Sequence, residues 1–188
     1  MPYFPQVPND LDEKLRFKRI DKRFCYYHED HKMYVLKSYN TIVAMFIKKS
    51  NTLFYDLNAY SSYTGRHKGV FVTSIIEEKI GNIIYIPQTY LINFIRNTLD
   101  NKSIDIKIDM PFKVGEYVKL YRLHNLATKT AKVSMVSGRF DFVKGNNVDA
   151  CTVTPTYYTV YIPNYTNKEY PQNIFCYTRN LRHLDKGI

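Results

Sequence analysis

The chain has 188 residues and a formal net charge of +10 at pH 7, and it combines 18 Tyr and 11 Phe with no Trp. With 45% hydrophobic and 23% charged residues, its composition is typical of a globular protein rather than a disordered one. No apolar run reaches the roughly 18 residues that a membrane span needs. Residues 1–5 lack the cationic and apolar blocks of a signal peptide, so we expect neither membrane insertion nor secretion.

The first 110 residues predict a small mixed sheet with one or two helices. Asn9 is followed by acidic residues that suit the positive end of a helix, so a short helix is expected to begin there. Four stretches rich in β-branched and aromatic residues then predict strands, and the last two are typical of a hairpin. These strands are expected at residues 24–27, 33–37, 41–48 and 52–57.

Residues 58–81 leave two interpretations open. A helix that starts near Ser61 would place several apolar residues on one face. Gly65, Gly69 and a run of β-branched residues disfavour that helix.

The clearest helix follows a short strand that we expect at residues 83–86. Pro87 suits the first turn of a helix, and the apolar residues of segment 87–99 recur on one face. Alternating isoleucines then predict a half-buried strand at 103–108. Residues 110–112 are typical of a junction between two lobes.

Beyond this junction the pattern becomes all β. Strands are expected at residues 115–122, 129–137, 150–153 and 157–162, before a polar tail at 164–188. Segment 113–162 resembles the SH3-like small barrels, several of which bind RNA in translation. The fold class is therefore predicted to be α+β, with an α+β lobe at 1–110 and an SH3-like β-barrel lobe with its tail at 111–188.

Positive charge is concentrated in the second lobe. Residues 1–110 hold 16 Lys and Arg against 12 Asp and Glu, whereas residues 111–188 hold 11 against 5. Such an excess favours polyanionic partners, through phosphate contacts and the release of counterions. Two alternatives stay open: the charge reflects the Lys-, Asn- and Ile-rich usage of an AT-rich genome, or it belongs to a basic inhibitor directed at an acidic protein surface.

Hydroxyls, an imidazole and two cations gather in the block at residues 58–68. Backbone N–H groups at a helix start, together with Arg66 and Lys68, suit a bound phosphate. The alternative is structural, with Ser61 as a helix cap and His67 packed on a tyrosine. The candidate binding residues of this block are Tyr60, Ser61, Thr64, Arg66, His67 and Lys68.

With the hairpin before it, this block resembles a family of uncharacterised phage and plasmid proteins. Their shared core runs Tyr-Ser-x-Thr-Thr-x-x-His, after a hairpin with a Thr-x-Val-Ala element. The resemblance covers residues 39–68 and implies a mobile genetic element, acting in the cytoplasm of a bacterial host or carried in a virion. Tyr63 stands where the family often has a threonine. The matching residues are Tyr60, Ser61, Thr64 and His67.

Tyrosines alternate with cations along the predicted strands of the second lobe. Such a face stacks bases on its rings and holds phosphates with its Lys and Arg side chains. The alternative is that the tyrosines fill the gap between core and solvent in a chain without tryptophan. The candidate residues of this lobe are Lys119, Tyr121, Arg122, Lys132 and Arg139.

Signals for metal binding or catalysis are sparse. His28 and His31 have the spacing of metal ligands but no second pair, and a structural zinc site needs four ligands. Known nucleophile and phosphate-loop motifs are absent from the sequence. The acidic residues considered for a metal-dependent nuclease are Asp105, Asp109, Asp141 and Asp149. Three widely spaced cysteines, Cys25, Cys151 and Cys176, are expected to be buried thiols rather than a disulfide framework.

The sequence therefore predicts a non-enzymatic binding protein without a cofactor or a metal. The expected partner is nucleic acid or a nucleoprotein complex, bound through a basic, tyrosine-rich surface. The alternatives are an inhibitor of a host defence complex, similar in role to anti-CRISPR proteins, a virion component, and a metal-dependent nuclease. DNA, RNA and protein targets are not distinguished, and the oligomeric state stays open.

Overall fold

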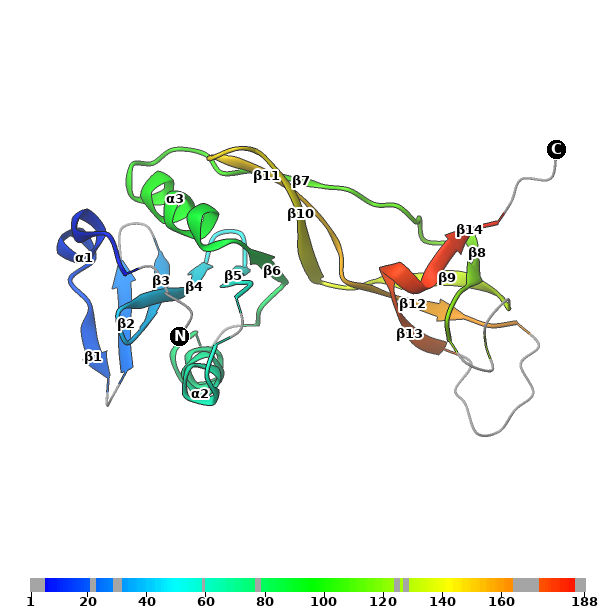
Figure 1. The fold of residues 1–188 in the computed structure, drawn as a ribbon, viewed down its shortest axis with the longest axis horizontal. Coiled ribbons are helices and arrows are strands. Elements are labelled where there is room, and N and C mark those ends of the chain that lie inside the picture. The colour runs from blue at the N-terminus through cyan, green and yellow to red at the C-terminus, as the bar shows by residue number, and fades with distance from the viewer. Residues whose placement is uncertain are drawn as a thin grey trace. The chain divides into compact units, whose positions relative to one another are not determined.

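The computed structural model describes residues 6–20, 23–28, 32–58, 60–76, 79–123, 126, 129–163 and 173–184, with the strands at 18–28 described by their backbone alone (Figure 1). Within these residues the chain is an α+β protein with two sheets, which confirms the predicted class. It forms two compact units, Met1–Lys107 with Phe142–Thr152, and Ile108–Asp141 with Val153–Ile188. One boundary was expected near residue 110, whereas segment 142–152 returns to the first unit.

The nine-stranded sheet lies mostly in the first unit, although the start of β10, the end of β11 and the last residue of β7 belong to the second, and it runs in the order β1-β2-β3-β4-β5-β6-β10-β11-β7. Its strands are β1 (Lys18–Ile20), β2 (Arg23–His28), β3 (Met33–Ser38), β4 (Thr41–Ile47), β5 (Thr52–Asp56), β6 (Asn82–Ile86), β7 (Asp105–Ile108), β10 (Arg139–Asn147) and β11 (Ala150–Pro155). The helical elements are α1 (Asn9–Leu15), α2 (Ser62–Val70), the π-helical turn η1 (Phe71–Ile76) and α3 (Gln88–Leu99). The strands expected from the sequence are present, and β1 and β10 are additions. In β7 the isoleucines still alternate, but Ile108 is 45% exposed, so the strand is less buried than expected.

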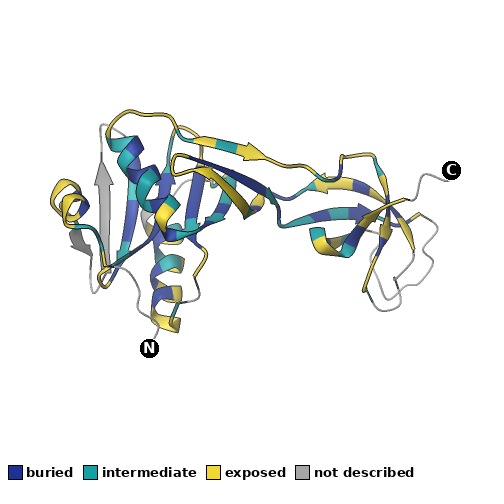
Figure 2. Ribbon diagram, turned by 45° about the horizontal axis from the view of Figure 1, so that its top comes forward, coloured by how far each residue is buried: buried dark blue, intermediate teal, exposed yellow. Residues whose placement is uncertain are grey.

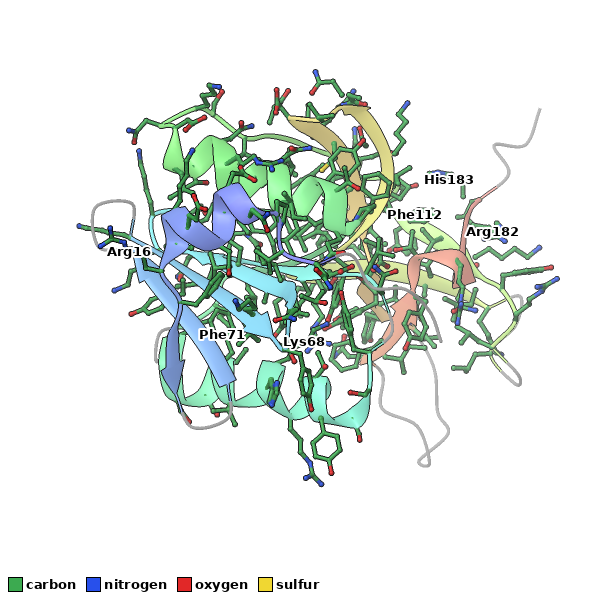
Figure 3. The ribbon with its side chains drawn as sticks, turned by 60° about the vertical axis from the view of Figure 1, so that its left-hand side comes forward. Arg16, Lys68, Phe71, Phe112, Arg182 and His183 are labelled. Atoms are coloured by element: carbon green, nitrogen blue, oxygen red, sulfur yellow. The ribbon has the colours of Figure 1, made fainter. Side chains whose placement is uncertain are left out.

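Helices cover both faces of this sheet, with α3 on one face and α2 with η1 on the other (Figures 1 and 3). Consecutive strand residues point to opposite faces, so Leu53 and Phe54 pack on different helices. The Phe54 ring lies 5.8 Å from that of Phe94 in α3, and Leu53 shares a core cluster with Phe71 of η1. Burial on both faces explains the continuous apolar run of β4.

Segment 58–81, which the sequence left open, is the crossover between two parallel strands. β5 pairs in parallel with β6, from Thr52 beside Asn82 to Asp56 beside Ile86. Parallel neighbours need a long connection, and here α2 and η1 supply it. The β-branched run that disfavoured a helix takes the π-helical form.

The sheet of the second unit runs in the order β13-β12-β9-β8-β14. Its strands are β8 (Tyr117–Leu120), β9 (Thr130–Val136), β12 (Tyr157–Tyr161), β13 (Asn173–Tyr177) and β14 (Leu181–His183), and the 3-10 turn η3 (Thr178–Asn180) joins the last two. Alternate residues form a core that includes Val118, Val133 and Tyr158 (Figure 2). Part of the tail expected to be polar therefore supplies two strands.

The turn η3 joins the two edge strands of this sheet. From Tyr177 to Leu181 the chain reaches at most about 14 Å, whereas the edges of a flat five-stranded sheet lie about 19 Å apart. The sheet must therefore curl. Within the described residues no strand pairing joins β13 to β14, so a closed SH3-like barrel is not shown.

Gly145 is expected to be required by the ring packed over β10. A β-carbon at this position would overlap the ring and hydroxyl of Tyr90, which packs 5.1 Å from the Phe142 ring. Gly145→Ala should destabilise the protein by about 1–3 kcal/mol, measured by urea unfolding. In a Tyr90→Ala background the same substitution should leave the free energy of unfolding unchanged. An equal loss of stability in both backgrounds would contradict the role assigned to Tyr90.

Candidate nucleic-acid interface

The candidate residues at the start of α2 bind mainly to the protein itself. The Ser61 hydroxyl caps the helix by accepting from the Thr64 N–H at 3.5 Å. His67 is buried, and its Nδ1 lies 2.7 Å from the Ser38 hydroxyl, which lies 3.2 Å from that of Thr64. The Tyr39 ring packs on the imidazole at 5.8 Å. This buried polar cluster fixes α2 to the end of β3.

Asp56, at the end of β5, is the centre of a second internal network. Its buried carboxylate accepts hydrogen bonds from the Tyr60 hydroxyl and from the backbone and side-chain N–H groups of Asn58. The Lys68 ammonium donates to the Asp56 carbonyl at 3.4 Å and lies 5.0 Å from the rings of Tyr55 and Tyr60 (Figure 3). These contacts connect Lys68 of α2 to the end of β5.

Burial changes the acid–base behaviour of this network. It lowers the pKa of Lys68, although the negative charge of Asp56 opposes the change. It also raises the pKa of Tyr60, and the hydrogen bond to Asp56 raises it further. Of the six candidate residues in this block, only Arg66 and Ser61 are exposed, and Ser61 is engaged as the cap.

The two glycines of α2 provide a test of its structural role. A β-carbon at Gly65 or Gly69 meets no atom within 4 Å, so alanine fits at both positions. Gly65→Ala and Gly69→Ala should each stabilise the protein by about 0.5–1 kcal/mol, as measured by thermal unfolding. Gly115, with a φ of 90°, is the control, since alanine there should destabilise. A loss of stability in both helix variants would contradict the assignment.

Of the candidate residues of the second unit, Lys119 and Lys132 lie on one face of its curled sheet. Tyr117 and Lys119 of β8 and Lys132 of β9 point outward, and Tyr117 pairs directly with Lys132. Arg182 of β14 pairs with Lys119. We call the outward side chains of this sheet the outer face. Its described residues include no Asp or Glu; they are Tyr117, Lys119, Thr130, Lys132, Ser134, Met135, Tyr157, Thr159, Tyr161, Asn173, Phe175, Tyr177 and Arg182.

Cations lie against tyrosine rings at the β8–β14 end of the outer face. Tyr121 follows β8, and its ring lies 4.6 Å from the Arg182 guanidinium and 5.0 Å from that of Arg122. The Lys132 ammonium lies 5.8 Å from the Tyr117 ring. We call this group the basic tyrosine cluster; its members are Tyr117, Lys119, Tyr121, Arg122, Lys132 and Arg182.

The cations of this cluster have no acidic partner within the part of the chain that the structure describes. Among the described residues no carboxylate lies within ion-pair distance of any of them, although Lys37, Arg96 and Lys102 of the first unit pair with aspartates. Lys119 and Arg182 stand opposite each other on neighbouring strands, and like charges in that position destabilise a sheet. The cluster therefore costs stability that an anion bound there would restore.

The turn before β8 is fixed by Glu116. Its carboxylate accepts from the Lys113 N–H at 2.9 Å and contacts His183 Nδ1 at 2.8 Å. The His183 ring packs on Phe112 at 4.7 Å (Figure 3). These contacts join β8 to β14, the two strands that carry Lys119 and Arg182.

Glu116 should make the stability of the protein depend on pH. The Lys113 N–H and then His183 lower the pKa of its carboxyl in the folded state. The charged form is therefore favoured by folding, and its contribution is present above the ordinary glutamate pKa of about 4.3. As the pH falls through the lowered folded value, this contribution is lost. The stability difference between the protein and Glu116→Gln, measured by urea unfolding, should shrink from pH 6 to pH 3; a constant difference would contradict this.

Arg139 lies apart from the basic tyrosine cluster, although the sequence placed it in the same binding set. It is exposed at the start of β10, but no described contact joins its side chain to the cluster. Sequence reasoning left Tyr117, Arg179 and Arg182 out of the set. A cation two or three residues from a tyrosine is a weak signal, and only the pairing of β14 with β8 places Arg182 on Tyr121.

The described residues give little support to other chemistry. Cys151 and Cys176 are free and buried, as expected, and burial raises the pKa of each thiol to about 11. Among the described residues no three His, Cys, Asp or Glu side chains gather as metal ligands would. The side chains of His28, His31 and Cys25 lie outside the described part of the chain. No described helix has the length and apolarity needed to cross a bilayer.

Comparison of the chain with protein-family models, curated proteins and solved structures gives no match. The function is therefore inferred from the geometry of the two candidate regions. The block at α2 is occupied by internal contacts, whereas the basic tyrosine cluster presents cations and rings to solvent.

Proposed function

We propose that this protein binds nucleic acid through the basic tyrosine cluster and the rest of the outer face. One observation carries the proposal: exposed cations lie against tyrosine rings on a face whose described residues include no carboxylate. Phosphates suit the cations, and unpaired bases suit the rings. Single-stranded nucleic acid, in which bases are free to stack, is the partner that this arrangement favours.

The contacts that hold the rings strengthen this proposal. The Tyr121 N–H donates to the Asn180 carbonyl at 2.8 Å, and the Asn180 amide donates back to the Tyr121 carbonyl at 3.1 Å. The backbone beneath the ring is thus fixed before any ligand binds, which reduces the entropy lost on binding. The curled sheet joined by η3 is compatible with the SH3-like barrel that segment 113–162 resembles, and we propose that architecture for the unit. An origin in a phage or plasmid remains a prediction from the resemblance of residues 39–68.

A protein partner is the second candidate, and exposed apolar side chains favour it. Phe175 is 71% exposed and Met135 is 53% exposed, and both pair with Thr159 of β12. Exposed aromatic side chains are frequent at the centre of protein interfaces. An inhibitor bound through them would lose affinity in Phe175→Ala and depend little on salt.

The proposal is tested by fluorescence anisotropy with a labelled 20-nucleotide single strand and its duplex. If four cations contact phosphates, log Kd for the single strand should rise with log salt at a slope of about 3. Arg122→Asn should weaken binding and lower that slope by about 0.7, while asparagine suits the left-handed backbone there (φ 55°). Tyr121→Ala should cost about 1–3 kcal/mol of binding and Tyr121→Phe much less.

Arg66→Gln is the matched control. Arg66 is also exposed and lies 5.8 Å from a tyrosine ring, that of Tyr63, but it belongs to α2. The Arg66→Gln substitution should leave the affinity for the single strand and the slope of log Kd against log salt almost unchanged. Equal losses in Arg66→Gln and Arg122→Asn, or affinity independent of salt, would overturn the proposal.

A further inference from the structure

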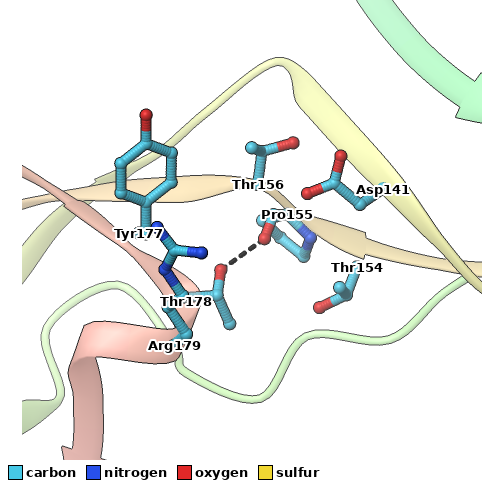
Figure 4. A pocket seen from close by; sticks show the side chains of 7 residues that line it. All are labelled: Asp141, Thr154, Pro155, Thr156, Tyr177, Thr178 and Arg179. Carbon is cyan, nitrogen blue, oxygen red and sulfur yellow. Dashed lines mark hydrogen bonds between the residues drawn. The ribbon is translucent and has the colours of Figure 1, made fainter. Parts of the chain in front are cut away.

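The second unit contains a pocket beside the outer face, with a volume of about 470 Å³ (Figure 4). β10 and β11 supply one part of its wall, and η3 with the end of β13 supplies the other. The lining residues are Asp141, Thr154, Pro155, Thr156, Tyr177, Thr178 and Arg179. The Thr178 side chain and N–H bond to the carbonyls of Pro155 and Thr156, so the two parts of the wall are held together.

The pocket has an aromatic wall and two opposite charges. The Tyr177 ring lies 5.0 Å from the Arg179 guanidinium, and both side chains are exposed. Asp141 lines the same pocket, but among the described residues it forms no ion pair, with Arg179 or with any other cation. The Thr156 hydroxyl is buried, with no hydrogen-bond partner within the described part of the chain. The wall therefore offers an acceptor, a donor and an unsatisfied hydroxyl.

The pocket is continuous with the outer face on both sides. Tyr177 pairs with Tyr157 across β13 and β12, and the Tyr157 ring contacts Phe175 at 5.7 Å. Through η3, the Arg182 guanidinium donates to the Arg179 carbonyl at 2.8 Å while it lies on Tyr121. A single-stranded nucleic acid bound to the basic tyrosine cluster would thus reach the pocket within a few nucleotides.

We infer that this pocket binds a single guanine base of the bound strand. Tyr177 would stack on the base, Arg179 would lie at its edge, and Asp141 would accept the adjacent N1–H and N2–H groups. Arg179 donors suit the acceptors O6 and N7, which are the usual partners of arginine on guanine. Thymine and uracil offer the Asp141 carboxylate one N–H in place of two, so they satisfy it less well. They also lack N7, which removes one acceptor for Arg179. The inference depends on the proposed function and adds base preference to it.

The test compares two 20-nucleotide strands, as DNA and as RNA, by competition anisotropy. One contains only thymine or uracil, and the other has guanine at every third position, a spacing that prevents stacked guanine tetrads. The protein should bind the guanine strand more tightly by about 5- to 150-fold, the discrimination expected of one bidentate pair. Asp141→Asn should abolish the preference while its affinity for the thymine strand stays equal or rises, because a negative charge is removed.

Asp109→Asn is the matched control, since Asp109 is exposed in the same unit and does not line the pocket. It makes the same charge change and should retain the preference for guanine. Tyr177→Ala should lose the preference and Tyr177→Phe should keep it. Equal binding of both strands by the unmodified protein would overturn this inference and leave the proposed function standing. Binding of neither strand at low salt would overturn both.

Discussion

The turn η3 imposes the constraint on which the proposed binding surface depends. Three residues connect strands at opposite edges of a five-stranded sheet, so the sheet must curl until the edges approach. Curling brings the end of β13 next to the start of β14. Tyr177 with Arg179 and Tyr121 with Arg182 then become two parts of one surface, joined by the bond from Arg182 to the Arg179 carbonyl. A longer connection would not require this proximity.

The two candidate regions show how similar residues take different roles. At α2, His67 and Lys68 satisfy buried polar groups, and that use stabilises a helix whose two glycines make it weak alone. On the outer face, Lys119 and Arg182 stand opposite each other without an acidic partner among the described residues. Repulsion between these two like charges lowers the stability of the sheet. Such departures from local consistency are typical of functional sites.

The sequence predicted much of the fold because its signals are local. The alternating isoleucines of β7, the apolar stripe of α3 and the continuous apolar run of β4 follow from periodicity alone. Segment 58–81 was ambiguous because Ser38, a distant residue, supplies the partner of His67 and stabilises the helix. β13 and β14 were missed because short strands in a polar tail gain their stability from pairing with β12 and β8.

Composition and strand periodicity by themselves determined that the second lobe is a basic, tyrosine-rich β structure, since charge and alternation are properties of the chain. Only the tertiary structure decided which cations meet which rings. Arg182 contacts Tyr121 across about 60 residues of sequence, and Asp141 and Arg179 line the same pocket. Such contacts depend on strand register and sheet curvature. The pairing of β13 with β12 and of β14 with β8 joins distant segments, and the short turn η3 curls the sheet only once that pairing places the two strands at opposite edges.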